Sequence, residues 1–205
     1  MRATARCWNW CSARWPSTRG SSPRPPTAGP ISSAAVPTAR APGAACSRDV
    51  GSSSRLTRAA IALGSNLGER RSALQDAATR LGRHLDGLII SDFIETAPEG
   101  VGQQPRFLNG AAVGDWAGDA RALLELLLAI ETAAGRERPF PGAPRTLDLD
   151  LILFGSAIID EPGLTVPHPR FRERRFVLGP LSQIAPELVD PVTGRTVAGL
   201  YRSLG

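Results

Sequence analysis

Two aspartates at alternate positions of one short segment suggest chemistry more directly than any other residues of the chain. Residues 145–155 alternate polar and apolar side chains from Thr146 to Leu151, which is the period-two pattern of a β-strand. Asp148 and Asp150 then point to one face, roughly 6.5–7 Å apart along the strand. Carboxylates at that spacing repel each other unless a cation lies near them. Their oxygens suit Mg²⁺, which usually also keeps waters and phosphate oxygens. With Arg145 at its start, the segment therefore indicates a metal–phosphate site.

A solvated strand face is the competing interpretation of the same two aspartates. The strand continues as Leu151–Phe154, which is apolar on both faces and favours a central strand of a sheet. Unpaired exposed acids are less expected on such a strand. On this segment alone, the metal site and the solvated face both stay open.

Arginine is the side chain that would have to bind phosphate in this protein. The chain contains no lysine, so it has no Walker A loop, and it lacks the glycine-rich dinucleotide motif. Arg136, Arg138 and Arg145 bracket the loop before the aspartate strand, and residues 170–175 hold four more arginines. A solvated helix face would explain the second cluster equally well. Guanidinium groups bind phosphate in a bidentate way, however, so two clusters beside a carboxylate pair favour a polyphosphate ligand.

Several other polar and aromatic residues are candidates only in combination. His168 lies between two prolines, and Asn66 and Asn109 stand at the ends of short predicted strands. Taken singly, the histidine is explained as a turn residue and the amides as turn or cap residues. Phe107 and Phe176 are explained as core residues.

Alternating strands and helices must position these side chains. Strands are predicted at 58–63, 88–94, 107–113 and the aspartate strand, with helices near 73–81 and at 120–134. Asp119 is the expected N-cap of the second helix, and Gly135 is expected to end it. The order β-α-β-β-α-β predicts an α+β fold of the ferredoxin-like type, an antiparallel sheet with helices on one face. A C-terminal extension follows it.

The positive net charge of +5 does not belong to this predicted domain. Residues 1–58 carry nine arginines and one acid, whereas residues 59–205 carry fifteen arginines and eighteen acids. The domain is therefore mildly acidic, which argues against a nucleic-acid-binding surface. Residues 1–57 lack periodicity and are rich in Ser, Pro, Gly and Arg. We expect them to be a disordered or spurious extension, with the functional domain at 58–205.

The position of the cysteines and the lack of a long apolar stretch indicate where the protein works in the cell. All three cysteines lie in the N-terminal segment, so the domain needs no oxidising compartment. No stretch approaches the ~20 apolar residues of a membrane span. We expect a cytoplasmic protein without a membrane partner. The sequence leaves the oligomeric state open.

Four motifs in the domain occur together and in a fixed order. They are Ile61–Gly68, Pro144–Asp150, Leu164–His168 and Pro180–Pro186. With them the chain resembles the 6-hydroxymethyl-7,8-dihydropterin pyrophosphokinase family over about residues 59–190. The segment Pro144–Asp150 is the most specific of the four. The family's loop before this segment usually contains a tryptophan, whereas this chain has Phe140.

The resemblance implies transfer of pyrophosphate from ATP to 6-hydroxymethyl-7,8-dihydropterin, giving AMP and the pterin diphosphate in folate biosynthesis. It implies that Asp148 and Asp150 hold two Mg²⁺ ions. The implied catalytic residues are Arg136, Arg145 and Asp150. The implied ATP-binding residues are Arg138, Arg145, Thr165, His168 and Arg174. The implied pterin-binding residues are Thr96, Ala97, Glu99, Phe107, Asn109 and Phe176.

Two other classes of protein remain open at this point. A non-catalytic ferredoxin-like binding module would need no metal and would expose aromatic residues on its sheet. A nucleotidyl transferase would use the same metal pair for a different transfer. The acidic domain and the aspartate pair argue against the binding module.

We predict that residues 1–57 are dispensable, because their composition cannot bury enough apolar surface to offset the entropy of ordering them. A chain beginning near Arg58 should keep its fold and its activity. Circular dichroism and turnover of the shortened and full-length chains would test this. Loss of soluble, active protein on truncation would contradict it.

Overall fold

The computed structural model of the chain describes residues 56–98, 104–135 and 143–205. The predictions for residues 1–55 and for Glu99, Arg136 and Arg138 lie outside these ranges. Among the described residues, no helix combines the length and the apolar character needed to cross a membrane.

One five-stranded antiparallel sheet is the framework of the domain. In sheet order its strands are β2, β4, β1 and β5, and β3 pairs with β4 beyond the end of β2. The strands are β1 (Thr57–Ser65), β2 (Asp86–Ile90), β3 (Ile94–Thr96), β4 (Phe107–Trp116) and β5 (Asp148–Phe154). Helices α1 (Arg70–Leu81) and α2 (Ala120–Ala133) connect them. This order confirms the predicted ferredoxin-like α+β fold.

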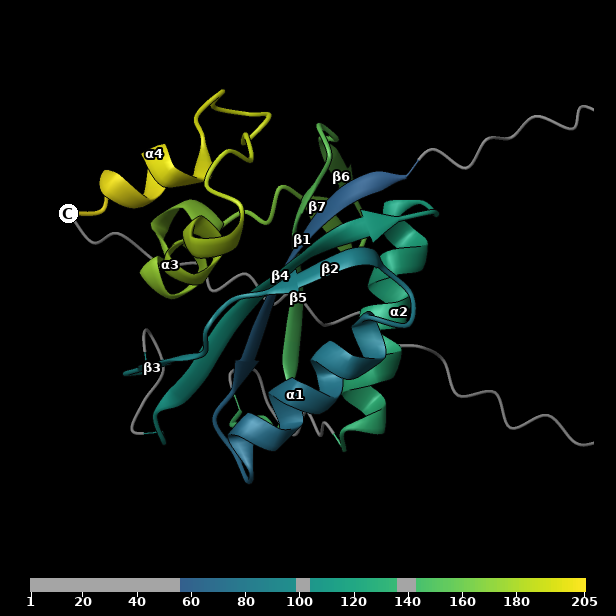
Figure 1. Cartoon of the computed structure of the whole chain (residues 1–205), viewed down its shortest axis with the longest axis vertical. Coiled ribbons are helices and arrows are strands. Elements are labelled where there is room, and N and C mark those ends of the chain that lie inside the picture. Colours follow the sequence, from purple (N-terminus) through teal and green to yellow (C-terminus); the bar gives the residue numbers. More distant parts are fainter. Residues whose placement is uncertain (1–55, 99–103, 136–142) are drawn as a thin grey trace, which may run out of the picture. The chain divides into compact units, whose positions relative to one another are not determined.

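Helices α1 and α2 cover one face of the sheet (Figure 1). The helical period predicts that Ala73, Leu74, Ala77, Ala78 and Leu81 of α1 face inward. Leu74, Ala77 and Leu81 are buried there, whereas Ala73 and Ala78 are half-buried. From α2, Leu123 and Leu127 enter the same core without any exposed surface. Burial of these apolar side chains provides the main free energy that holds the two crossover helices to the sheet.

The helices of the C-terminal extension cover the opposite face of the sheet (Figure 1). The extension begins with a small hairpin, β6 (Ile159–Glu161) and β7 (Leu164–Val166), whose Leu164 and Val166 enter the first core, and it continues through a 3₁₀ turn. Helices α3 (Arg175–Ile184) and α4 (Val197–Arg202) follow and form a second core. Helices therefore lie on both faces of the sheet, whereas the sequence predicted them on one face and left the packing of the extension open.

The aspartate strand β5 is an edge strand, so the prediction of a central strand was wrong. Its apolar character on both faces has another cause: Leu149 and Leu151 enter the first core, and Ile152 and Leu153 enter the second. The two neighbouring residues share a face because the pairing with β1 shifts by one residue beside Ile152. Residues 151–154 are therefore apolar because both faces of β5 are covered by a core, and not because β5 has a neighbouring strand on each side.

The second predicted strand is interrupted in the structure. Residues 88–94 were expected to be continuous, but β2 ends at Ile90 and β3 begins at Ile94. At the break, the Ser91 hydroxyl accepts a hydrogen bond from the Ala111 N–H at 2.9 Å, which replaces part of the regular ladder. The Phe93 ring fits over Gly110, where an added Cβ would lie only 2.6 Å from the ring. A side-chain hydroxyl and a glycine thus permit a break that periodicity does not reveal.

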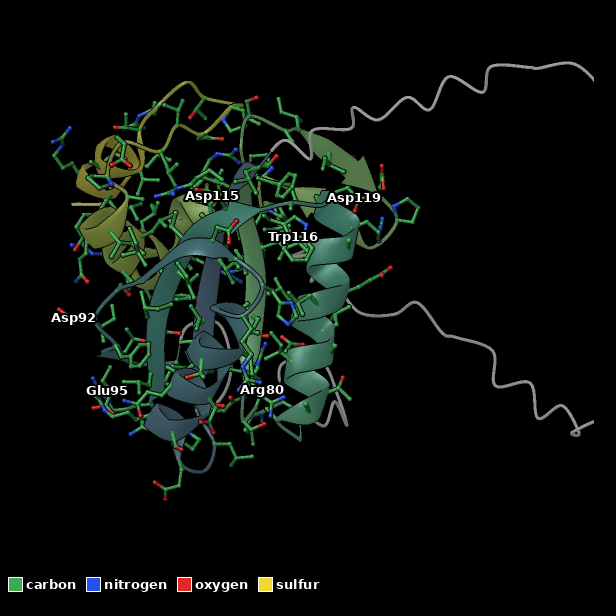
Figure 2. All side chains as sticks on the ribbon, turned by 45° about the vertical axis from the view of Figure 1, so that its right-hand side comes forward. Arg80, Asp92, Glu95, Asp115, Trp116 and Asp119 are labelled. Carbon is green, nitrogen blue, oxygen red and sulfur yellow. The ribbon has the colours of Figure 1, made fainter. Side chains whose placement is uncertain are left out.

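The predicted start and end of α2 are confirmed. The Asp119 carboxylate accepts a hydrogen bond from the Ala122 N–H at 2.7 Å, as an N-cap should. The Trp116 indole donates to the Asp119 carbonyl at 3.0 Å, so β4 joins α2 through a tight connection (Figure 2). Gly135 follows the helix with φ of 73°, a conformation that favours glycine.

A buried ion pair anchors the C-terminal turn to the segment before α3. Arg172 donates two hydrogen bonds to Asp190, at 2.6 and 2.7 Å, and the Thr193 hydroxyl adds a third at 2.6 Å. Asp190 has no exposed surface. Burial opposes ionisation, but the hydrogen bonds from Arg172 and Thr193 outweigh it and lower the pKa of Asp190 to about 2.

We predict that Asp190→Asn lowers the free energy of unfolding at pH 7 by about 2 kcal/mol. A carboxyl with a depressed pKa stabilises the fold above its unfolded-state pKa of 3.8, and this contribution disappears as the pH falls toward about 2. The difference between variant and wild type should therefore shrink between about pH 4 and pH 2. Denaturant unfolding across that range measures it. Asp92→Asn, at an exposed carboxylate (Figure 2), is the control. A pH-independent difference would contradict this assignment.

Candidate active site

The strand register brings together two residues that are thirty-nine positions apart in the sequence. Gly64 of β1 pairs with Asn109 of β4 on one side and with Asp148 of β5 on the other. Directly paired residues project from the same face of an antiparallel sheet. Asp150 pairs with Ala62 and shares this face. The predicted pterin-binding amide and the predicted metal-binding carboxylates therefore flank a strip of β1 that carries almost no side chain.

Each of the two aspartates has an arginine beside it. Arg145 forms an ion pair with Asp148 at 2.7 Å, and Arg174 approaches Asp150 at 4.0 Å. Burial and the charge of Asp148 raise the pKa of Asp150 to about 7, although Arg174 opposes the shift. Ionised Asp150 is thus unfavourable in the metal-free protein. A carboxylate pair in this state favours an additional cation.

Asn66 fixes the position of Arg145. Its side-chain oxygen accepts a hydrogen bond from the Arg145 N–H at 2.8 Å, and its own N–H donates to the Arg145 carbonyl at 3.1 Å. Its side-chain amide donates to Gln104 at 2.9 Å. The sequence analysis explained Asn66 as a turn residue. The structure shows that this turn residue joins the end of β1 to the start of the aspartate segment.

His168 is buried next to the charged residues of the site. Burial and the charge of Arg174 lower the pKa of His168 to about 4, so the imidazole is neutral at physiological pH. Its Nδ1 atom accepts a hydrogen bond from the Arg170 N–H at 3.2 Å, which leaves Nε2 as the donor. Its backbone N–H donates to Ile152 of β5 at 3.0 Å. The segment after β7 is thereby attached to the aspartate strand.

Arg174 lies directly before α3, and its side chain lies near both Asp150 and Phe176. Its guanidinium lies 5.5 Å from the centre of the Phe176 ring, within the range of a cation–π contact. Helix α3 packs on β3 and β4, so Phe176 belongs to the same side of the sheet as the aspartates. Thr165, by contrast, lies in β7, where its hydroxyl donates to Asp160 at 3.4 Å.

The predicted pterin-binding residues of β3 and β4 are adjacent. The Asn109 side-chain amide donates to the Thr96 hydroxyl at 2.8 Å, and Thr96 pairs with Phe107 in the sheet. Phe107 and Asn109, two positions apart on β4, point to the same face. Ala97 follows β3 as an exposed residue. Thr165 differs from the other predicted site residues in the described ranges, because its side chain contacts Asp160 within the small hairpin.

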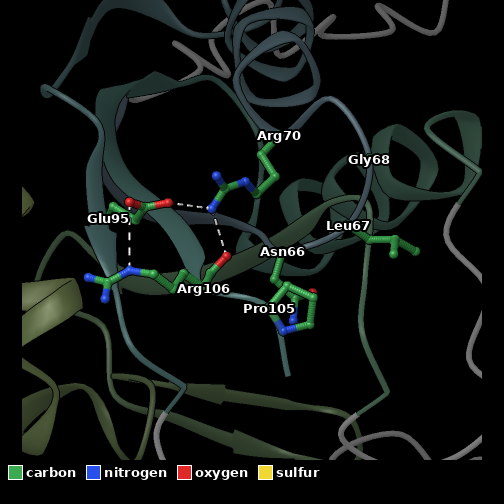
Figure 3. Close-up of a pocket in the computed structure, with 7 residues that line it drawn as sticks. All are labelled: Asn66, Leu67, Gly68, Arg70, Glu95, Pro105 and Arg106. Atoms are coloured by element: carbon green, nitrogen blue, oxygen red, sulfur yellow. Dashed lines mark hydrogen bonds and ion pairs between the residues drawn. The ribbon is translucent and has the colours of Figure 1, made fainter. Parts of the chain in front are cut away.

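A pocket of about 420 Å³ opens beside Asn66 at the start of α1 (Figure 3). Its charged side chains bond to one another: Arg70 donates to Glu95 and to the Arg106 carbonyl, both at 2.8 Å. Glu95 and Thr96 are neighbours on β3 and therefore point to opposite faces. The pocket thus adjoins β3, the strand of Thr96, without containing the aspartates. It does not define the active site.

The residues present fit magnesium ions held together with nucleotide phosphates. In the described ranges, no group of three or more His, Cys, Asp or Glu side chains is arranged to hold a metal. Mg²⁺ needs only one or two carboxylates when phosphates and waters complete its shell. The paired aspartates, with the raised pKa of Asp150, meet that requirement. A site of this kind depends on the nucleotide.

Sequence reasoning missed two residues that shape this site. Gly64 lies in the motif Ile61–Gly68, but its importance comes from the residues paired with it, which the motif does not reveal. Glu131 of α2 is 2% exposed and accepts a hydrogen bond from the β5 backbone. A signal for Glu131 was available: it follows Leu124 and Leu127 at helical spacing, on the buried face of α2.

A ferredoxin-like sheet with paired carboxylates, arginines and a neutral histidine on one face is the arrangement expected of a phosphoryl-transferring enzyme. The comparisons with known proteins agree. The chain belongs to the 7,8-dihydro-6-hydroxymethylpterin-pyrophosphokinase (HPPK) family, whose model matches residues 60–186. The predicted class of enzyme, a pyrophosphokinase of folate synthesis, is thereby confirmed.

Two bacterial relatives carry the name 2-amino-4-hydroxy-6-hydroxymethyldihydropteridine pyrophosphokinase. The chain is 42% identical to that of Pseudomonas aeruginosa over 138 residues, 66% of this chain and 85% of the relative. It is 41% identical to that of Bacillus subtilis over 135 residues, 65% of this chain and 81% of the relative. Among solved structures, wild-type HPPK-DHPS of Plasmodium falciparum is similar, with a TM-score of 0.58 at 16% identity. That match covers 73% of this chain and 45% of the other, and it supports the fold alone.

We predict that Gly64→Ala lowers turnover about tenfold, equivalent to about 1.4 kcal/mol in the transition state. The added methyl carbon would lie 3.1 Å from the Asn109 side-chain oxygen and 3.8 Å from the Asp148 Cβ atom, so the amide must shift. Steady-state kinetics and thermal unfolding test this. Alanine suits a strand at least as well as glycine, so the fold should persist. Gly82→Ala, which meets only ordinary contacts, is the control. Unchanged turnover in the Gly64 variant would refute the idea.

Proposed function

We propose that this face of the sheet transfers pyrophosphate from ATP to 6-hydroxymethyl-7,8-dihydropterin, giving AMP and the pterin diphosphate. The family and the names of the bacterial relatives support these substrates. We assign the nucleotide side to Arg145, His168 and Arg174, and the pterin side to Thr96, Asn109 and the two phenylalanines. Asp148 and Asp150 would hold two Mg²⁺ ions, while Arg136 and Arg138 would contact phosphate from the loop before Arg145.

The pairing of Asn109, Gly64 and Asp148 across three strands is the observation that carries this proposal. The pterin hydroxymethyl oxygen must reach the β-phosphorus of ATP from the side opposite the leaving AMP. Both substrates therefore have to meet over the sheet with little between them. Gly64 carries no side chain, and it lies between the amide that would orient the pterin and the carboxylate beside the phosphates. Much of the catalysis is then positioning of the two substrates.

The reaction forms a bond between the hydroxymethyl oxygen and the β-phosphorus and breaks the bond from that phosphorus to the oxygen of AMP. The hydroxyl proton is released in the same transfer. Bound Mg²⁺ would supply Lewis-acid stabilisation of the phosphate oxygens. Arg145 and Arg174, which pair with the two aspartates, would also stabilise the developing negative charge.

His168 contributes a hydrogen bond and no charge in this scheme. Its pKa of about 4 keeps it neutral, and its Nδ1 atom is engaged with the Arg170 backbone. Nε2 then carries the ring hydrogen, and in the proposed scheme this hydrogen is donated to a phosphate oxygen or to the nucleotide when ATP binds. A neutral donor orients a phosphate without competing with the metal cations for the aspartates.

Asp150 connects metal binding with proton release. In the metal-free protein the pKa of Asp150 is about 7, so its carboxyl is partly protonated near neutral pH. Binding of a cation requires the ionised form, so metal uptake should release a proton. The same carboxylate is the nearest candidate for accepting the hydroxymethyl proton when its ligand role allows.

We predict that Asp150→Asn loses most turnover and yet stabilises the metal-free protein. A carboxyl whose pKa is raised from 3.8 to about 7 weakens the fold progressively as the pH rises through that range. The amide removes this cost, so the melting temperature of the variant should exceed that of the wild type by a few degrees at pH 8. Thermal unfolding in a chelator measures this effect. Formation of AMP from ATP and the pterin measures turnover.

Asp76→Asn, at an exposed position of α1, is the matched control and should change neither quantity. Near-normal AMP formation by folded Asp150→Asn would remove Asp150 from the site. Formation of ADP in place of AMP by the wild type would overturn the proposed transfer itself.

A further inference from the structure

Glu131 is an acidic residue at a position where α2 otherwise buries apolar side chains. It is 2% exposed and lies one helical turn beyond Leu127 on the inner face of the helix. A buried carboxylate is unfavourable unless hydrogen bonds or charges compensate it. Its presence among leucines therefore calls for a role that an apolar residue would not fill.

The contact that Glu131 makes is with the backbone of the aspartate strand. One of its side-chain oxygens, Oε1, accepts a hydrogen bond from the Leu149 N–H at 2.7 Å. Leu149 is the residue between Asp148 and Asp150, and β5 is an edge strand of the described sheet. An edge strand presents backbone groups that have no neighbouring strand to pair with. Glu131 satisfies one of them at the residue between the two carboxylates.

The charge of Glu131 also reaches the carboxylate pair. Glu131 accepts a hydrogen bond from the N–H of Leu149, the residue between Asp148 and Asp150, so a third carboxylate lies beside the pair. Three acidic side chains thus contribute negative potential at this point. Arg145 and Arg174 are the cations that pair with the two aspartates.

We propose that Glu131 is a positioning residue for the divalent cations of the transfer reaction: it holds the backbone between Asp148 and Asp150 and adds negative potential that strengthens cation binding. The proposal rests on the proposed function of the two aspartates. Glu131 itself is not assigned as a ligand, because its Oε1 atom is engaged with Leu149. Residues that orient metal ligands typically affect metal affinity by about 10–100-fold.

Two substitutions separate the hydrogen bond from the charge. Glu131→Gln keeps a side-chain oxygen that can accept from Leu149 but removes the charge, whereas Glu131→Ala removes both. Glu125→Gln, at an exposed position of the same helix, is the matched control. Binding of Mn²⁺ in the presence of a non-hydrolysable ATP analogue, followed by electron paramagnetic resonance, reports the metal site without requiring turnover. Thermal unfolding in a chelator reports the fold.

We expect Glu131→Gln to bind Mn²⁺ about tenfold more weakly and to require correspondingly more Mg²⁺ for half-maximal turnover. Its turnover at saturating Mg²⁺ should stay within a few-fold of the wild type. Glu131→Ala should bind the metal more weakly still and lose turnover that added Mg²⁺ does not restore. If the alanine variant fails to fold, the glutamine variant alone decides the question.

Wild-type Mn²⁺ affinity in Glu131→Gln would overturn the proposal, whatever its thermal stability, because it would leave Glu131 a purely structural residue. Failure of the proposed function gives a different result. In that case the wild type would form no AMP from ATP and the pterin, or Asp150→Asn would stay active. The Mn²⁺ affinities of the Glu131 variants are measured independently of both outcomes.

Discussion

The pairing of β1 with β4 on one side and β5 on the other is the constraint on which the active site depends. Asn109, Gly64 and Asp148 come from three strands that are distant in sequence, and the ladder hydrogen bonds place them side by side. A slip of one residue would turn each side chain to the opposite face of its strand. Because the cores on both faces hold the alternating apolar residues in place, such a slip would expose leucines and bury aspartates. Packing of the cores therefore fixes the geometry of the chemistry.

Incomplete compensation of negative charge is the second feature of this face of the sheet. Two carboxylates lie together with Arg145 and Arg174 as partial counterions, and the raised pKa of Asp150 reports that the compensation is incomplete. Such an arrangement reduces the stability of the metal-free fold, and it is the basis for the proposal that a cation binds there with the nucleotide. The pair formed by Arg172 and Asp190 is the opposite case. It is fully hydrogen-bonded, lowers the pKa of its carboxyl, and holds the segment that leads to Arg174.

Much of the fold was accessible from the sequence because local patterns agreed with the final packing. The helix period of α1, the Asp119 cap of α2 and the alternation in β5 all predicted elements that the structure contains. The failures have physical causes. The apolar run of β5 was attributed to neighbouring strands, whereas helices and the C-terminal extension cover its faces. The break at Ser91 depends on a hydroxyl that replaces a ladder bond with β4, a contact that no local pattern records.

The sequence by itself determined the type of chemistry, since the aspartate spacing, the arginines in place of lysine and the four ordered motifs are properties of the chain. Only the tertiary structure decided how these groups act together. Three contacts each join segments that are far apart in the chain: the close approach of Asn109 to Gly64, the hydrogen bond between Asn66 and Arg145, and the hydrogen bond between Glu131 and Leu149. Side-chain type is local, whereas the protonation of Asp150 and the neutrality of His168 follow from burial and neighbouring charges. Those surroundings exist only once the strands have paired and both faces of the sheet are covered.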